Sequence, residues 1–387
     1  MSSREQFRTG FAIAEAVLAD LRQRLDLTRW PLTPEGEPWA HGTSLDYLRG
    51  VIEHWRSGFD WRASESRINQ YRHYLFPVNG RQVHAVVIGD ANGDRPPVLF
   101  GHGWPGAFTE FLGVAERLAY PELHGGSAID ATTVVLVSLP GCGLSSAPVA
   151  PIAPREIARD WLELMQAHLG FERFFVHGSD WGAAIGSWLA ADAPNAVLGL
   201  HLTSAIIQPD ITAPGIQLDD EERTFVQRRA ARGPWESGYQ TIQGSKPLTL
   251  AYGLTDSPTG LAAWILEKYQ SWGAARGTSG PPLIPLNELL TILSLYWFAG
   301  PGPSTWIYRF LLDGTGLRFP HGIRVAVPTA ICSFHYDVSP PSPATWQGRC
   351  YDVVRRTTVD HGGHFPGLDA EAALAADISA FTTQLLD

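Results

Sequence analysis

The sequence predicts an α/β fold in which helices cover a mostly parallel central sheet, with a helical lid and an N-terminal extension. From about residue 92, short apolar runs alternate with segments of helical periodicity, which is typical of a parallel sheet packed between helices. The alternation pauses after about residue 206 and resumes near residue 325, so an insertion interrupts the sheet. The runs expected to form strands are PPVLF, TTVVLVSLP, FFVHG, VLGLHLT, VAVPTAICSF and DVVRRTTV.

An N-terminal extension, residues 1–76, precedes this pattern. Its apolar spacing predicts a first helix over 12–25 and a second over about 44–57. After Asn79-Gly80, the alternating segment RQVHAVVIG predicts a strand that is entered through a hairpin turn. The apolar face of the first helix is expected to consist of Ile13, Val17, Leu21 and Leu25.

Three further parts follow the extension: a first part of the core at 77–206, a lid at 207–318 and a second part of the core at 319–387. The lid is expected to lie over the carboxyl ends of the strands, where the sites of open α/β sheets form. Its first helix begins with acidic residues at 219–222 and is expected to end in arginines before Gly233. This arrangement predicts helix capping and a solvated face rather than a ligand site. The arginines are Arg228, Arg229 and Arg232.

The bulk composition narrows the class of protein. The 387 residues carry a formal charge of −10, which disfavours nucleic acid and anionic membranes as main partners. No apolar run is long enough to span a bilayer, and the start, MSSREQFRTG, lacks the apolar core of a signal peptide. Three scattered cysteines indicate neither a disulfide framework nor a zinc site. We therefore expect a cytoplasmic protein, with a homodimer as one option for its assembly.

The stretch RFFVHGSDWGAAIG, residues 173–186, has the form Gly-x-nucleophile-x-Gly. In this motif a sharp turn between a strand and a helix exposes the central side chain above the sheet. The central residue is Asp180, where a serine is more usual, and its alternative role is that of a helix cap. A carboxylate nucleophile forms an ester with a saturated carbon, as in an epoxide or an alkyl halide. The motif therefore predicts Asp180 as a nucleophile for such a substrate.

Hydrolysis of an ester on Asp180 needs a base and a group that orients the base. His364 follows the last strand and two glycines, so it is the predicted base, with His361 as the rival. Asp337 lies just past the strand VAVPTAICSF and is the predicted acid. Asp210 and Asp360 remain alternatives for the acid.

The segment HGWPG, residues 102–106, follows the strand PPVLF. A loop at this position supplies one backbone donor of an oxyanion hole, and the residue after the nucleophile supplies the other. The N–H groups of Trp104 and Trp181 are therefore expected to hold the oxyanion of the ester's tetrahedral intermediate. One such donor typically contributes about 2.7–4 kcal/mol.

Taken together, these motifs resemble those of the microsomal-type epoxide hydrolase family, with its N-terminal epoxide hydrolase domain and α/β-hydrolase fold. Their order and spacing are specific, and they cover most of the chain. Within this family the chain is similar to soluble bacterial members, including natural-product enzymes of actinomycetes such as those of enediyne pathways. The matching stretches are RLDLTRWP, FDWRASESRINQY, HGWPG, GSDWG, ESGYQTIQGSKPLTLAYGLTDSPTGLAAWILEKYQSW, LYWFAG and GGHF.

The resemblance implies a reaction between a small-molecule epoxide and water that needs no cofactor and no metal. It assigns the nucleophile to Asp180, the base to His364 and the acid to Asp337. It also implies two lid tyrosines that donate hydrogen bonds to the epoxide oxygen. Tyr239 matches the first of these closely, whereas Tyr308 matches the second only after a shift of one residue. A tyrosine hydroxyl with a pKa near ~10 donates such a bond without ionising at neutral pH.

The chain departs from the family pattern at three places. Ser179 stands where the family often has the second glycine of Gly-Gly-Asp-Trp-Gly. The acid segment is FHYD, residues 334–337, in place of Phe-Pro-x-Glu, so the shorter Asp337 must approach His364 more closely. Cys142 stands where an aromatic residue is frequent, which changes the expected pocket wall.

Three other functions stay open from the sequence: a haloalkane dehalogenase, a cyclase that opens the epoxide with the substrate's own hydroxyl, and a non-catalytic binding protein. A dehalogenase needs halide donors rather than paired tyrosines, and the retained Asp, His and Asp set disfavours the other two. Tryptophans of the lid favour a bulky aromatic or natural-product epoxide as the substrate. They are Trp235, Trp264, Trp272, Trp297 and Trp306.

Overall fold

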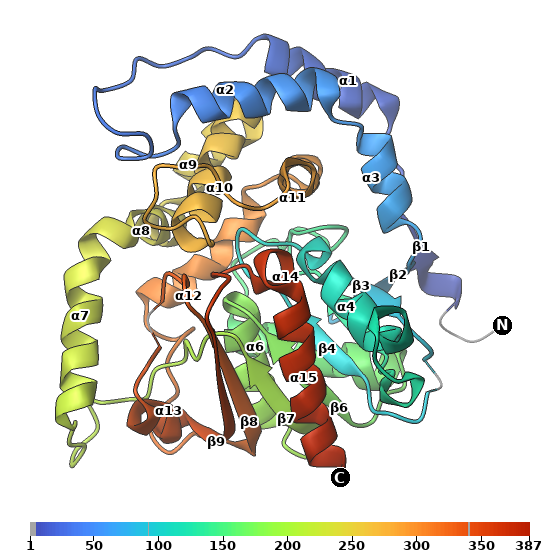
Figure 1. Cartoon of the computed structure of the whole chain (residues 1–387), viewed down its shortest axis with the longest axis vertical. Coiled ribbons are helices and arrows are strands. Elements are labelled where there is room, and N and C mark those ends of the chain that lie inside the picture. The colour runs from blue at the N-terminus through green and yellow to red at the C-terminus, as the bar shows by residue number, and fades with distance from the viewer. Residues whose placement is uncertain (1–4, 92, 340) are drawn as a thin grey trace.

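The computed structural model describes residues 5–91, 93–339 and 341–387, apart from the side chains of residues 5 and 232–235. A nine-stranded sheet with helices on both faces forms the centre of the molecule (Figure 1). Its order is β1-β2-β3-β5-β4-β6-β7-β8-β9. The strands are β1 (Arg8–Thr9), β2 (Arg72–Val78), β3 (Arg81–Ile88), β4 (Val98–Gly101), β5 (Val134–Val137), β6 (Phe174–Gly178), β7 (Val197–Leu202), β8 (Val325–Phe334) and β9 (Tyr351–Val359).

The sheet is parallel from β5 to β9, and β1, β2 and β3 extend it in antiparallel pairs. The predicted mostly parallel α/β fold is therefore confirmed. The predicted hairpin is present as well: Asn79 and Gly80 have φ values of +47° and +75°. Two successive residues with positive φ are typical of the type I′ turn, whose twist suits antiparallel strands.

Two pairs of helices cover the sheet. Helices α5 (Pro154–Glu163) and α6 (Trp181–Asp192) pack together on one face, and α4 (Leu112–Ala119) and α15 (Glu371–Leu386) pack together on the other (Figure 1). Every residue of α6 from Trp181 to Ala190 is buried. Close packing of this helix is possible because many of these residues are Gly, Ala or Ser. Two shorter helices, α13 (Ala344–Cys350) and α14 (Pro366–Asp369), lie in the connections around β9.

A helical lid is inserted between β7 and β8 and lies on the side of the sheet where the parallel strands end (Figure 1). A 3₁₀ segment, Pro303–Tyr308, immediately precedes its last short helix. The lid helices are α7 (Asp220–Glu236), α8 (Gly238–Ser245), α9 (Pro247–Asp256), α10 (Pro258–Trp272), α11 (Leu286–Ala299) and α12 (Arg309–Leu312).

The N-terminal helices α1 (Glu15–Asp26), α2 (Leu45–Glu53) and α3 (Trp61–Ile68) lie across α10 and α11 of the lid (Figure 1). The hydroxyl of Thr28, in the extension, lies 2.7 Å from the hydroxyl of Thr259 in α10. The indole N–H of Trp55, in the extension, donates to the hydroxyl of Ser294 in α11 at 3.1 Å, and this contact is buried. The extension is therefore bound to the lid as well as to the edge of the sheet.

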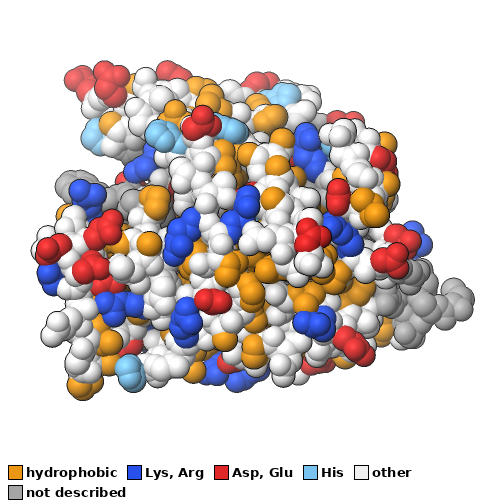
Figure 2. Space-filling model, turned by 60° about the horizontal axis from the view of Figure 1, so that its bottom comes forward, with side chains coloured by type: hydrophobic (Ala, Val, Ile, Leu, Met, Phe, Trp, Pro, Cys, Tyr) orange, Lys and Arg blue, Asp and Glu red, His pale blue; other side chains and the backbone are white. Residues whose placement is uncertain are grey.

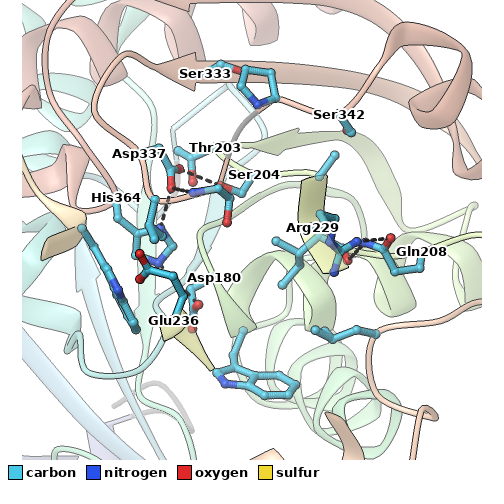
Figure 3. A pocket seen from close by; sticks show the side chains of 18 of the residues that line it. Asp180, Thr203, Ser204, Gln208, Arg229, Glu236, Ser333, Asp337, Ser342 and His364 are labelled. Atoms are coloured by element: carbon cyan, nitrogen blue, oxygen red, sulfur yellow. Dashed lines mark hydrogen bonds and ion pairs between the residues drawn. The ribbon is translucent and has the colours of Figure 1, made fainter. Parts of the chain in front are cut away.

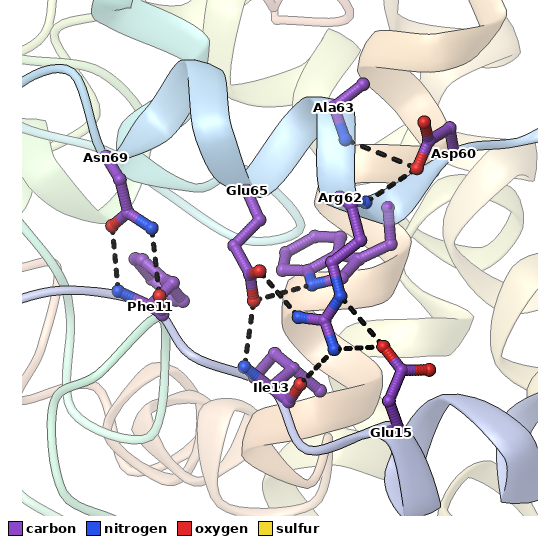
Figure 4. A network of polar contacts seen from close by, with 9 residues as sticks. Phe11, Ile13, Glu15, Asp60, Arg62, Ala63, Glu65 and Asn69 are labelled. Carbon is purple, nitrogen blue, oxygen red and sulfur yellow. Dashed lines mark hydrogen bonds and ion pairs between the residues drawn. The ribbon is translucent and has the colours of Figure 1, made fainter.

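Glu65 of α3 holds the first residues of the extension in place (Figure 4). Its carboxylate accepts hydrogen bonds from the Ile13 N–H at 2.8 Å and from the Trp61 indole N–H at 3.0 Å. It also pairs with Arg62, which reaches the exposed Glu15 with its other nitrogens. Because the Glu65 side chain is only 12% exposed, little water is available to replace these bonds.

Two details of the helices differ from the sequence predictions. Val17 is 41% exposed, and Leu18, Leu21 and Leu25 form the buried side of α1, so the predicted face was wrong at this position. Helix α7 was expected to end before Gly233, but it continues to Glu236, directly before α8. Intrinsic propensity is a weak guide at such a boundary, because tertiary packing overrides it.

On the face shown in Figure 2, acidic and basic side chains are interspersed among hydrophobic ones. Within the described ranges, no helix is both long and apolar enough to cross a membrane. Large apolar side chains that are exposed include Leu32, Ile129 and Val149, which lie in separate segments. Single exposed side chains of this kind are ordinary on protein surfaces.

The Glu65 network generates a stability prediction. Glu65→Ala leaves the Ile13 amide and the Trp61 indole without their acceptor, which costs about 1–3 kcal/mol for a buried donor. We expect the free energy of unfolding in urea to fall by that amount. Glu15→Ala is the control, because this carboxylate is 72% exposed and an exposed ion pair contributes about 0–1 kcal/mol. Equal losses in both variants would contradict the role given to Glu65.

Candidate active site

Asp180 stands at the turn between β6 and α6. Its φ of +50° is a left-handed conformation that is costly for a residue with a side chain. The neighbouring glycines make the turn sterically feasible. A Cβ on Gly178 would collide with the first turn of α6, and a Cβ on Gly182 would collide with the backbone of Gly101 in β4. Close packing of the helix on the strands therefore holds the elbow that the motif predicts.

The Asp180 carboxylate lies between a backbone donor and a histidine. The Trp104 N–H donates to Oδ1 at 3.0 Å, and His364 Nε2 lies 3.4 Å from Oδ2. Gly103 permits this approach, since a Cβ there would overlap the Asp180 side chain. Trp181 is the first residue of α6, and an N–H at that position has no partner within the helix. The Trp104 N–H is thus beside the carboxylate, and the role of the Trp181 N–H as the second donor stays a prediction.

On its other side, His364 contacts Asp337. The Nδ1 atom of His364 lies 3.1 Å from Asp337 Oδ1. Two further donors hold this carboxylate: the Ser339 N–H reaches Oδ1 at 2.9 Å, and the Ser204 hydroxyl reaches Oδ2 at 3.0 Å. The three side chains from the elbow, the end of β8 and the segment after β9 therefore form one chain of contacts. The short aspartate reaches the histidine despite its departure from the family pattern.

Electrostatics couples these groups. Burial raises the pKa of Asp337, but the charge of His364 and the hydrogen bonds from His364, Ser339 and Ser204 outweigh burial and lower it. Burial lowers the pKa of His364, but the carboxylates of Asp337 and Asp180 outweigh burial and hold it well above its usual value. The imidazole is therefore protonated as long as both carboxylates are charged.

The alternative residues lie elsewhere. His361 is 58% exposed and pairs with Asp360 at 2.9 Å, and the Asp360 side chain is 99% exposed. Asp210 is an exposed turn residue that accepts from the Thr212 N–H at 3.0 Å. None of these three residues lines the pocket that contains Asp180. The structure therefore brings together His364 and Asp337 and leaves the alternatives at the surface.

Tyr239 of α8 and Tyr308 before α12 face the same space. Their rings are 5.6 Å apart, and the ring of Tyr239 stacks on Trp104 while Tyr308 meets Trp181 edge-on. Both are buried, and Tyr308 Oη has no hydrogen-bond partner among the described residues. Burial, assisted by the charge of Asp180, raises the pKa of both hydroxyls above its usual value. Both therefore carry a proton and are available as donors.

The pocket above Asp180 has a volume of about 280 Å³ (Figure 3). Of the lid tryptophans with described side chains, Trp272 lines it, whereas Trp264, Trp297 and Trp306 do not. The Trp264 indole instead bonds to Gln243. The side chain of Trp235 lies outside the described residues. A ring of lid tryptophans around the substrate is therefore not what shapes this pocket.

Two further lid tyrosines hold the loop 102–106, and no role for them was predicted from the sequence. The Tyr269 hydroxyl of α10 donates to the Pro105 carbonyl at 3.2 Å. The Tyr296 hydroxyl of α11 donates to the Gly106 carbonyl at 2.9 Å. These bonds fix the backbone on which the Trp104 N–H is presented. Both tyrosines fall within stretches that match the family, EKYQSW and LYWFAG, but nothing local shows what they contact.

Two buried acids near His364 were also missed. Glu110, within the apolar segment FTEF, is 3% exposed, and its Oε1 has no partner among the described residues. Burial raises the pKa of Glu110 to about 8. Burial also raises the pKa of Asp369 to about 6, although the N–H groups of Gly363 and Ala274 donate to it. Glu110 is therefore largely uncharged at neutral pH. An acidic residue between aromatic and aliphatic neighbours is the sequence feature that could have pointed to this buried acid.

Glu110 makes stability depend on pH in a defined direction. Between the unfolded pKa near ~4.3 and about 8, the unfolded chain loses the proton that the folded chain keeps, so stability falls as pH rises. Glu110→Gln removes this pH-dependent loss of stability. We therefore expect the free energy of unfolding of the variant, relative to that of wild type, to rise by up to about 1.4 kcal/mol per pH unit from pH ~5 to ~8. Urea unfolding at several pH values measures this, with the exposed Glu122→Gln as the control. Parallel pH profiles for Glu110→Gln and wild type would contradict it.

Comparison with known proteins identifies the family to which the chain is similar. Residues 6–111 match the family described as "Epoxide hydrolase N terminus", and residues 96–233 match "alpha/beta hydrolase fold". A relative from Stigmatella aurantiaca is 34% identical, over 97% of this chain and 84% of that protein. Epoxide hydrolase 1 of Sus scrofa is 32% identical, over 94% of this chain and 85% of that protein.

A solved structure shows the same arrangement of elements. The juvenile hormone epoxide hydrolase of the silkworm Bombyx mori superposes with a TM-score of 0.81 at 27% identity, over 98% of this chain and 93% of that chain. The similarity to curated relatives at more than 30% identity also extends over nearly the whole chain. This chain therefore belongs to the microsomal-type epoxide hydrolase family.

Proposed function

We propose that this protein hydrolyses an epoxide to a vicinal diol through a covalent ester on Asp180. One observation carries the proposal: a carboxylate in a nucleophile elbow lies within 3.4 Å of the His364 imidazole, and two buried tyrosines face the same pocket. Membership in the epoxide hydrolase family supports the same activity. The roles below are assigned to this chain's own residues from their contacts.

In the first step, an oxygen of Asp180 attacks an epoxide carbon, and the carbon–oxygen bond of the ring breaks. Oδ2 is the suitable nucleophile, because the Trp104 N–H already occupies Oδ1. The electron pair of the broken bond stays on the epoxide oxygen as a developing alkoxide. Tyr239 and Tyr308 donate hydrogen bonds to this oxygen and supply its proton. Their raised pKa values keep the protons in place until the alkoxide forms.

The ester itself prepares the second step. Alkylation removes the negative charge of Asp180, and this charge is one of the two that hold the pKa of His364 high. The pKa of His364 therefore falls, its proton passes to the tyrosinate that the first step leaves, and the neutral ring becomes available as a base. It then takes a proton from water, which attacks the ester carbonyl carbon. The Trp104 and Trp181 N–H groups stabilise the oxyanion, and its collapse releases the diol and restores Asp180.

Other chemistries fit the contacts less well. A haloalkane dehalogenase also uses an elbow aspartate, but paired tyrosine hydroxyls suit an oxygen that gains negative charge. Release of chloride from haloalkanes would favour that function. A cyclase or a binding protein has no need for the contacts among His364, Asp337 and Asp180. The enediyne-type resemblance, a bulky substrate, a cytoplasmic location and a homodimer remain predictions.

Removal of the base separates the two steps. His364→Ala is expected to form the ester but not to release it, because only the second step needs an activated water. Mass spectrometry after incubation with styrene oxide should find one equivalent of substrate on the peptide that contains Asp180, with no steady turnover. His361→Ala is the matched control and should turn over normally. An adduct at another residue, or normal turnover of His364→Ala, would rule out this assignment.

The tyrosines should act on the first step alone. A hydrogen bond to a charged group contributes about 1.5–3 kcal/mol, and about 1.4 kcal/mol corresponds to a factor of ten in rate. We expect Tyr239→Phe and Tyr308→Phe each to slow alkylation about ten- to a hundredfold and to leave ester hydrolysis nearly unchanged. Stopped-flow quenching of intrinsic tryptophan fluorescence resolves the alkylation phase, since Trp181 adjoins the nucleophile, and the surface variant Tyr120→Phe is the control. If either pocket variant alkylates at the wild-type rate, that tyrosine is not a donor.

A further inference from the structure

The active-site pocket has an arginine in its wall. Arg229 of α7 is the one Lys or Arg among the described residues that line it (Figure 3). From the sequence, the arginines of this helix were expected to cap it and to form a solvated face; Arg229 is exposed, as expected, but it also lines the pocket. Its neighbour Arg228 is exposed as well but does not line the pocket. Two adjacent arginines of one helix therefore have different surroundings.

Arg229 is oriented by contacts that leave its charge unneutralised. Its Nη1 donates to the side-chain oxygen of Gln208, and its guanidinium lies 5.7 Å from the centre of the Phe225 ring. Gln208 is itself fixed, because its Nε2 donates to the Ile206 carbonyl and its backbone N–H donates to the Leu317 carbonyl, each at 2.7 Å. The guanidinium is thus held by neutral groups from two sides.

No carboxylate among the described residues pairs with Arg229, whereas other arginines around α7 have partners. Arg349 pairs with Glu222 at 2.6 Å, and Arg223 pairs with Asp220 at 2.5 Å. A guanidinium has five N–H donors in a planar fork that matches a carboxylate or a phosphate. A positioned guanidinium in a concave site, without a counter-ion from the protein, is suited to an anionic group of a ligand.

The other charges of the pocket place such an anion away from the reacting atoms. Asp180 and Asp337 carry negative charge where the reaction takes place. Glu236 also lines the pocket, three residues before Tyr239 and seven residues after Arg229 on the same helix. Seven residues span roughly 10 Å of helix. Arg229 therefore lies toward the end of the pocket that is farther from the tyrosines along α7.

We propose that this pocket takes epoxides that carry an anionic group, a carboxylate in the simplest case, remote from the oxirane ring. The carboxylate pairs with Arg229, and the ring lies between Asp180 and the two tyrosines. Repulsion from the Asp180 carboxylate disfavours the reverse orientation, in which the carboxylate of the substrate would lie beside Asp180. This substrate class rests on the proposed epoxide hydrolysis, which Arg229 does not itself perform.

The test uses terminal epoxides of 7, 9 and 11 carbons with a carboxylate at the far end, and the methyl ester of each. In wild type, we expect the acid of matching length to have a kcat/KM about tenfold or more above that of its ester, mainly through a lower KM. Arg229→Gln should lower kcat/KM for that acid at least about tenfold and for the ester much less. Arg229→Lys should retain part of the preference, because it keeps the charge but not the fork.

Arg228→Gln is the matched control, since it removes the same charge from the next residue of the helix and should leave the preference intact. Equal kcat/KM values for acids and esters, or equal effects of the two glutamine variants, overturn the anionic substrate class while epoxide hydrolysis stands. Calorimetric binding of the diol acids and diol esters adds a readout that needs no turnover. If no epoxide is hydrolysed but the diol acids bind through Arg229, the proposed function fails and the anion site stands.

Discussion

The active site depends on one strained backbone conformation, the positive φ of Asp180. This conformation persists because α6 packs so closely on β4 and β6 that glycine is required at positions 178 and 182. The turn aims the carboxylate at the Trp104 N–H and at His364, so the donor and the base are both placed relative to a rigid part of the fold. A relaxed turn would break both contacts at once. The strain is therefore a cost that packing offsets, at the place where the geometry matters most.

The second organising feature is a shared charge balance. His364 lies between two carboxylates, and both raise its pKa. In the proposed reaction, one of these carboxylates becomes a neutral ester, so the first step changes the protonation of the group needed for the second. Asp337 remains charged because hydrogen bonds from Ser204, Ser339 and His364 compensate for its burial. In the proposed reaction, a single buried histidine thus serves both steps through a change in its own protonation.

Much of the site was predictable because its signals are local. The elbow at Asp180 and the hairpin at Asn79-Gly80 depend on glycines beside specific turns, and the structure contains both turns. The preference for His364 over His361 depended on short sequence context, and the structure puts only the former in the pocket. The place of Arg229 in the pocket wall was not predicted, because its sequence neighbourhood is that of a surface helix and the residue is indeed exposed. Its location in the pocket follows from how the lid packs on the core, which helical periodicity does not encode.

The lid, the extension and the oxyanion loop form one connected structure. The extension bonds to α10 through Thr28 and Thr259 and to α11 through Trp55 and Ser294. The same two lid helices carry Tyr269 and Tyr296, whose hydroxyls hold the carbonyls of the loop that presents the Trp104 N–H. The last residue of α10, Trp272, also accepts the His364 backbone N–H at 2.9 Å. The N-terminal extension therefore supports, through two helices, both the Trp104 N–H and His364 on either side of Asp180, although none of its described residues lines the pocket.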